Sequence, residues 1–134
     1  MAIYSPASLA RLQTCHPLLQ DLFHEVIKHT DCSIIFGYRN REEQEEAFNN
    51  GRSKAHYGQS NHNFYPSLAV DAMPYPINWE DMKGIHHFAG VVKGIAATKK
   101  IPIRWGGEFK GFFDGPHYEL IGITGKLKED SHGV

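Results

Sequence analysis

Apolar residues recur along this 134-residue chain at two different spacings, and the order of those spacings limits the folds that it can adopt. Residues 5–30 and 78–100 show helical spacing, and between them residues 41–50 form a helical stretch that is marked by its capping residues. Pro17 divides the first stretch into a short helix and a longer one, since proline breaks a helix interior. Four short stretches have the composition of β-strands, residues 32–38, 67–74, 101–107 and 117–123. Helices that precede and separate such short strands predict an α+β fold, a small antiparallel sheet packed with helices.

Capping residues mark the helix ends and leave one long loop. Asn40 is a good N-cap for the second helical stretch, Gly51 ends it, and Asn78 is expected to open the third. Residues 52–67 are polar and show no periodicity, so we expect a loop. A loop of this length in a small protein is more often functional than idle. With no internal repeat and no linker, residues 1–134 are predicted to form a single domain.

Charge and cysteine content exclude several classes of protein. Fourteen basic and fifteen acidic residues give a net charge of −1 without any block of like charge, which argues against nucleic acid or an anionic membrane as the main partner. Cys15 and Cys32 are interpreted as buried free thiols, consistent with synthesis in a reducing compartment. We find no signal peptide and no apolar run long enough to cross a membrane. The expectation is a monomer, made in the cytoplasm, that does not insert into membranes.

The chain contains nine histidines, and two of them lie near acidic residues at the ends of predicted strands. His62 precedes the second strand, Asp71 lies within it, and His117 begins the last strand. Two imidazoles and one carboxylate can bind a catalytic Zn²⁺ and leave a fourth position for water. Asp114 is separated from His117 by a tight Gly-Pro turn, so its carboxylate could take a proton from that water.

Each of these residues also has a purely structural interpretation. His62 could be an ordinary loop histidine, Asp71 a turn acid and His117 a hydrogen-bonded residue at a sheet edge. Their spacing is not a self-sufficient zinc motif such as H-E-x-x-H. Taken alone, the residues leave both a metal site and a structural role open.

Four longer segments, taken in order, resemble one known family over nearly the whole chain. They are SLARLQTCHPLLQDLF, IIFGYRNREEQEEAFNNGRS, SNHNFYPSLAVDAMP and IRWGGEFKGFFDGPHYEL. Together they are similar to the M15 zinc peptidases, which cleave D-Ala-D-Ala or L-Ala-D-Glu bonds, and most of all to the phage endolysins of that family. The resemblance implies the hedgehog/DD-peptidase fold that this family shares with the hedgehog signalling domain.

The resemblance also implies roles for individual residues. Matching positions in the family predict zinc ligands at His62, Asp71 and His117. Asp114 matches the general base, and Arg39 matches an arginine that binds substrate or stabilises the oxyanion. Four further residues match supporting positions around the site: Ser60, Gln44, Trp105 and Glu119.

One spacing departs from the family pattern. The family pattern is S-x-H-x-x-G-x-A-x-D, in which the aspartate is seven positions after the histidine. Here Asp71 is nine positions after His62, and Pro66-Ser67 replaces the glycine. We interpret this as a lengthened loop between two ligands. His56 is the alternative first ligand, although it lacks the preceding S-x spacing.

The resemblance predicts a phage-type endolysin, a zinc endopeptidase that hydrolyses the L-Ala-D-Glu bond in peptidoglycan stem peptides. Such a protein would accumulate in the cytoplasm of an infected bacterium and reach the cell wall through a holin-made lesion. One alternative is a bacterial D-Ala-D-Ala carboxypeptidase or dipeptidase. Another is a zinc-binding module of the same fold that has lost catalysis, although the presence of both Asp114 and Arg39 speaks against it.

Overall fold

A computed structural model describes residues 2–128 of the chain. In chain order its elements are α1 (Pro6–Leu12), α2 (Pro17–His29), β1 (Cys32–Phe36), α3 (Arg41–Asn49), β2 (Ala69–Pro74), α4 (Met82–Lys99), β3 (Ile103–Trp105) and β4 (His117–Leu120). Two short 3₁₀ helices, η1 (Asn61–Asn63) and η2 (Gly106–Glu108), lie in the loops. Every predicted helix and strand is present, and the α+β fold is confirmed.

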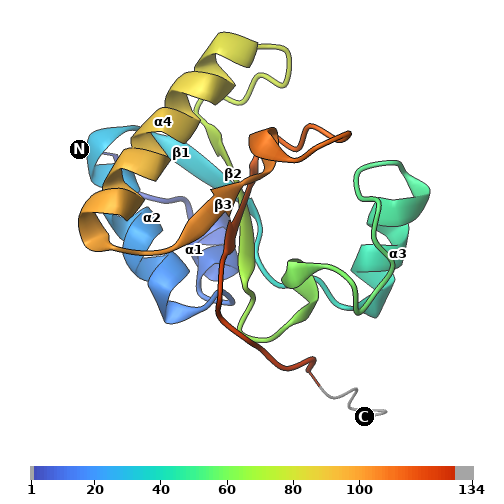
Figure 1. Cartoon of the computed structure of the whole chain (residues 1–134). Helices are drawn as coiled ribbons and strands as arrows, with labels where there is room; N and C mark the ends of the chain where they lie inside the picture. The colour runs from blue at the N-terminus through green and yellow to red at the C-terminus, as the bar shows by residue number, and fades with distance from the viewer. Residues whose placement is uncertain (1, 129–134) are drawn as a thin grey trace.

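The four strands form one antiparallel sheet in the order β1-β2-β4-β3 (Figure 1). The last strand of the chain therefore lies between β2 and β3. Its register with β2 pairs Val70 with Tyr118 and Asp71 with His117. Because side chains alternate between the two faces of a strand, Asp71 and His117 point to the face opposite Val70 and Tyr118.

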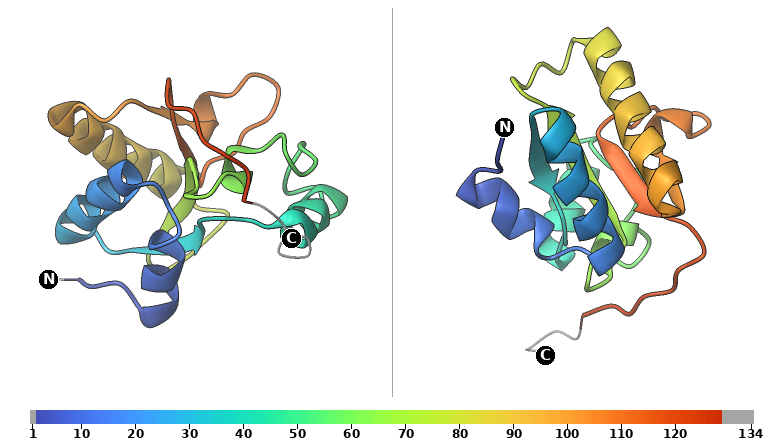
Figure 2. Two further views of the ribbon diagram at one scale, coloured as in Figure 1. Left: turned by 90° about the horizontal axis from the view of Figure 1, so that it is seen from below. Right: turned by 90° about the vertical axis from the view of Figure 1, so that its left-hand side faces the viewer.

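Helices α2 and α4 cover one face of the sheet, whereas α3 lies apart on the other side (Figures 1 and 2). The covered face is the one that carries Tyr118, because that ring contacts residues of both helices. The Tyr118 ring is buried between Phe23 of α2 and Phe88 of α4, at centroid distances of 5.7 and 6.3 Å. Aromatic contacts of this kind and the surrounding aliphatic residues form the hydrophobic core. The core thus occupies one face of β2 and β4, and the other face is free for polar residues.

The start of α4 differs from the prediction. The helix begins at Met82 with Asp81 as its N-cap, whose side chain accepts a hydrogen bond from the Gly84 N–H at 3.0 Å. Asn78 instead makes a local turn, since its side chain accepts from the Glu80 N–H at 3.0 Å. Both residue types can cap a helix, and side-chain bonding within a turn competes with capping. Residues 75–81 therefore remain an exposed loop.

Cys15 and Cys32 are buried and unpaired, as predicted. Burial raises the pKa of both thiols, to about 12 for Cys15 and about 11 for Cys32, so both are neutral. Among the helices of residues 2–128, none is both long enough and apolar enough to pass through a lipid bilayer.

Candidate metal centre

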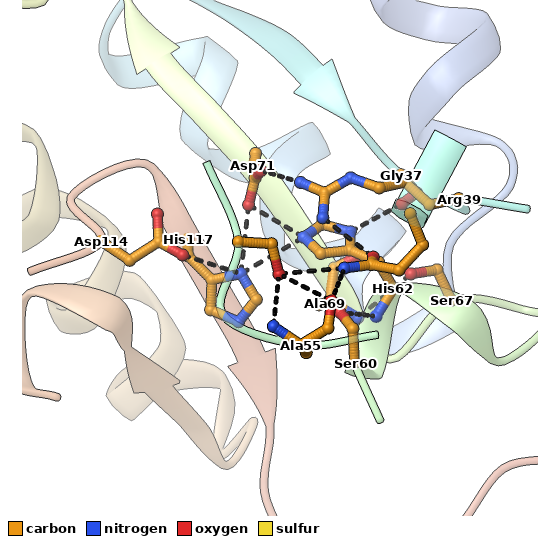
Figure 3. Close-up of polar contacts among 12 residues, drawn as sticks. Gly37, Arg39, Ala55, Ser60, His62, Ser67, Ala69, Asp71, Asp114 and His117 are labelled. Atoms are coloured by element: carbon orange, nitrogen blue, oxygen red, sulfur yellow. Dashed lines mark hydrogen bonds and ion pairs between the residues drawn. The ribbon is translucent and has the colours of Figure 1, made fainter. Parts of the chain in front are cut away.

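Three buried side chains from three separate elements converge on one point (Figure 3). His62 Nε2 lies 3.0 Å from Asp71 Oδ1 and 3.2 Å from His117 Nδ1, and the latter two atoms are 3.1 Å apart. All three residues are at most 6% exposed. The sequence expectation that these residues could form one site therefore agrees with their placement.

Two different features of the fold bring these residues together. The antiparallel register places Asp71 directly opposite His117. His62 arrives from η1, which is held near the end of β1 because the Arg39 N–H donates to the His62 carbonyl at 2.8 Å. Ser60 caps η1, with its hydroxyl accepting from the His62 N–H at 3.2 Å. Ser60 thus supports His62 through the backbone.

The outer nitrogens of the two histidines are bound to acceptors. His62 Nδ1 lies 2.7 Å from the Gly37 carbonyl, and His117 Nε2 lies 2.8 Å from Glu119 Oε1. A nitrogen that faces such an acceptor must carry the proton, which leaves the lone pair on the other nitrogen of each neutral ring. Both lone pairs and Asp71 Oδ1 then point at one another. Three acceptors this close repel one another unless a proton or a metal ion lies between them, so the cluster is chemically suited to a metal ion.

The charges of the cluster lead to the same conclusion. Burial lowers the pKa of His62, which favours the neutral ring. Burial alone would raise the pKa of Asp71, but His62 and His117 outweigh it and hold that pKa well below its usual range. For His117, burial is likewise outweighed, and hydrogen bonds to Asp71 and Glu119 raise its pKa to about 10. The site therefore takes up positive charge, which a proton or a metal ion can supply.

Arg39 is bound to protein groups rather than lying open at the surface. Its Nη2 donates to Asp71 Oδ2 at 3.0 Å, its Nη1 donates to Gln44 Oε1 at 3.1 Å, and the residue is 5% exposed. Gln44 in turn donates to Ser53 Oγ at 2.9 Å and to the Ala55 carbonyl at 2.8 Å. Arg39 and Gln44 thereby connect Asp71 to α3 and to the loop that follows it.

Asp114 faces the cluster without belonging to it. Its Oδ2 is 3.9 Å from His117 Nδ1, and its side chain is 23% exposed. Partial burial, with the nearby charge of Asp71, raises the pKa of Asp114 to about 6. The turn between Asp114 and His117 is held by Trp105, whose indole N–H donates to the Gly115 carbonyl at 2.7 Å. Trp105 and Glu119 thus occupy supporting positions around the site.

A cleft of about 350 Å³ connects the cluster to solvent. Its lining includes the two histidines, Asp114 and Arg39, together with Lys54 and Phe112. A cleft of this volume lies within the range of small-molecule binding sites. Asp114 is part of that lining, where a group that exchanges protons with a bound molecule would have to lie.

The lengthened loop does not change which histidine reaches the cluster. His56 is exposed and its Nδ1 lies 2.9 Å from Glu45 Oε1, so it is directed elsewhere. The longer connection is packed against the turn between α1 and α2, where the Ser67 N–H donates to the Thr14 carbonyl at 2.9 Å. His62 therefore remains beside Asp71 despite the nine-residue separation.

Two contributors could not be found from the sequence. Gly37 acts through its carbonyl oxygen, and a backbone atom leaves no mark on the residue pattern. Asn63 is fully buried and donates to the Arg39 carbonyl and to Gln44 Oε1, both at 3.2 Å. Its position next to His62 is the one available signal, and it is weak because asparagine is common in loops.

Three comparisons relate the chain to known proteins. A family model described as phage L-alanyl-D-glutamate peptidase matches residues 2–121. The peptidoglycan L-alanyl-D-glutamate endopeptidase CwlK of Bacillus subtilis (strain 168) is 32% identical over 110 residues, which cover 70% of this chain and 63% of the length of CwlK. The crystal structure of the Serratia marcescens L-Ala D-Glu endopeptidase ChiX superposes with a TM-score of 0.73 at 29% identity, covering 88% of this chain and 90% of ChiX.

Proposed function

This chain belongs to the phage L-alanyl-D-glutamate peptidase family, and from that premise we propose that it is a zinc-dependent endopeptidase of bacterial peptidoglycan. The bond that it hydrolyses is the amide between L-Ala and D-Glu in the stem peptides. The observation that carries the proposal is the convergence of His62, Asp71 and His117 beside an open cleft that the two histidines line.

Zinc suits this donor set better than the harder metal ions. Two nitrogens and one oxygen are typical of catalytic zinc sites, whereas calcium and magnesium prefer oxygen ligands throughout. Ligands about 2.0–2.1 Å from zinc at tetrahedral angles are about 3.3 Å apart. The three atoms here are separated by 3.0–3.2 Å, close to that value. We propose that His62, Asp71 and His117 hold the ion.

The chain's own residues prepare the site for amide hydrolysis. When bound, zinc supplies a Lewis acid that polarises the scissile carbonyl and promotes ionisation of water. Asp114 is the proposed general base, since its carboxylate faces the cluster at 3.9 Å from His117 without a hydrogen bond to it. Glu119 and the Gly37 carbonyl direct the imidazole lone pairs inward. Arg39 holds Asp71 and offers positive charge at the cleft wall for an oxyanion or a substrate carboxylate.

A digest of purified peptidoglycan tests the proposal. Mass spectrometry should find fragments with a new D-Glu amino terminus, and free D-Ala should not accumulate. Release of D-Ala would instead indicate a carboxypeptidase, and intact stem peptides with fully zinc-loaded protein would indicate a non-catalytic module. Removal of zinc by a chelator should abolish cleavage, and stoichiometric Zn²⁺ should restore it.

We propose further that the enzyme acts as a monomer in the lysis of an infected bacterium, reaching the wall from the cytoplasm through a holin-made lesion. The family description as a phage peptidase supports this role, and all three candidate ligands come from one chain. Expression in a susceptible bacterium should cause lysis only when a holin is expressed with it. Lysis by the enzyme alone would contradict the proposed route.

A further inference from the structure

A second hollow of about 300 Å³ adjoins the catalytic cleft. The two share the wall residues Arg39, Arg52, Phe112 and Asp114, so they lie side by side at the candidate metal site, and we refer to them together as the groove. The far wall of the second hollow is aromatic and includes Phe36, Trp79 and Phe113. We call this part the aromatic end of the groove.

Two large aromatic side chains at the aromatic end of the groove, Trp79 and Phe113, are exposed to solvent. Trp79 lies in the loop before α4, is 55% exposed, and stacks on no other aromatic ring within residues 2–128. Phe113 is 43% exposed but well supported, since its ring stacks on His86 at 5.7 Å and meets Trp105 edge-on at 5.9 Å. Exposed apolar surface in a groove commonly marks a ligand site. The Phe113 ring is therefore held by its neighbours, whereas the Trp79 ring has an exposed face on which a ligand could pack.

The catalytic cleft itself has a different chemistry. Its wall contains Gln59, Ser60 and Asn61, together with Lys54, whose ammonium lies 5.2 Å from the Phe112 ring centroid. This part of the groove offers hydrogen-bond donors and a cation. Arg39 and Arg52 line both hollows, whereas Lys54 lines only the first of them and Trp79 only the second.

The substrate of the proposed reaction has the same asymmetry, and the inference rests on that proposed function. On the D-Glu side of the scissile bond the stem continues as a peptide. Glutamate has two carboxyl groups and only one continues the chain, so a free carboxylate lies beside the scissile nitrogen. On the L-Ala side, the amino group of alanine is joined through a lactyl group to a sugar of the glycan strand. That sugar is therefore about two residue lengths, roughly 7 Å, from the scissile carbonyl.

We propose that the aromatic end of the groove binds the glycan sugar that carries the stem peptide, with Trp79 as its platform. The apolar C–H face of a sugar ring packs well on a flat indole, while the hydroxyl groups at its edge remain in water. The D-Glu carboxylate then lies toward Lys54. This orientation matches apolar with apolar surface and negative with positive charge.

The test compares one peptide with and without its sugar. For Trp79→Ala, kcat/KM on a disaccharide-tetrapeptide should fall about five- to tenfold, as expected for one aromatic contact, and kcat/KM on the sugar-free tetrapeptide should stay at the wild-type value. Tyr75→Ala is the matched control, because Tyr75 is in the same loop and 63% exposed but lines a separate hollow. It should leave both substrates unaffected.

Equal losses on both substrates, or no loss on either, would overturn the assignment. A wild-type enzyme that cleaves neither substrate would instead refute the proposed peptidase function. If Trp79→Ala does not fold, Trp79→Phe and a binding measurement replace it. In a calorimetric titration, the peptide-free disaccharide should bind zinc-loaded wild type and bind Trp79→Phe with weaker affinity, whereas an absence of binding to the wild type would also overturn the assignment.

Discussion

Replacing Arg39 with lysine keeps the positive charge but removes the planar guanidinium, so this change shows whether Arg39 serves the metal ligand or the substrate. The guanidinium bridges two acceptors, Asp71 Oδ2 at 3.0 Å and Gln44 Oε1 at 3.1 Å. A lysine ammonium is a point donor that cannot reproduce this fork. Within residues 2–128, Asp71 Oδ2 has no second hydrogen-bond donor, whereas Gln44 Oε1 also accepts from Asn63. The main loss therefore falls on Asp71.

The structure sets the size of the effect. Arg39 and Asp71 are only 5% and 6% exposed, so solvent cannot replace the lost contact. A hydrogen bond to a charged group contributes about 1.5–3 kcal/mol, and we expect the free energy of unfolding to fall by about 2 kcal/mol. For a chain of this length, that corresponds to a decrease of roughly 8 °C in melting temperature. Because Asp71 is then held less firmly, zinc affinity should fall about 10- to 100-fold.

Three measurements on Arg39→Lys separate the two roles. Thermal unfolding of the metal-free protein gives the stability, competition with a coloured chelator gives the zinc affinity, and wall digestion in excess zinc gives the turnover. Arg104→Lys, at an exposed arginine of β3, is the matched control and should resemble the wild type. Unchanged stability and zinc affinity with turnover reduced at least about tenfold would refute the support of Asp71 and leave Arg39 acting on the substrate. If all three measurements equal those of the wild type, Arg39 has no role in the site.

Three further changes test the other assignments. Asp114→Asn should leave zinc content and melting temperature nearly unchanged and lower turnover by about 10²–10⁴, the usual contribution of a general base, and reduced stability with retained turnover would instead make Asp114 a structural turn residue. His62→Ala should lose zinc and activity while His56→Ala keeps both, and metal analysis showing the reverse would place the first ligand at His56. Glu119→Ala should weaken zinc binding about 10- to 100-fold because the ring of His117 loses its acceptor, whereas Glu119→Gln, which keeps an acceptor oxygen, should bind zinc more tightly than Glu119→Ala in the same titration.

The order and type of the elements could be predicted because the signals for them are local. Helical periodicity, Pro17 and the Asn40 cap act over a few residues, and the structure has α1, α2 and α3 where those signals place them. The predicted start of α4 was wrong because two local signals compete there. Asn78 and Asp81 are both competent caps, and in the structure Asn78 bonds within a local turn while Asp81 caps the helix.

The candidate metal site was only partly predictable from the sequence. The residue types and the A-x-D and H-x-E endings indicate which side chains can bind a metal, and the resemblance selects His62 over His56. The spacing of nine residues could not show whether His62 reaches Asp71, because loop length alone does not define where a loop packs. The contact of Ser67 with the turn after α1 decides it.

The sequence by itself determined the strand–helix order and the set of residues able to bind a metal, because periodicity and side-chain chemistry are properties of the chain. Only the tertiary structure decided how those residues act together. The Gly37 carbonyl and Glu119 determine which ring nitrogen of His62 and of His117 carries the proton. The fold also directs the guanidinium of Arg39 toward Asp71. It also placed an aromatic hollow beside the catalytic cleft. These outcomes depend on backbone atoms and sheet register, which bring together residues far apart in the chain.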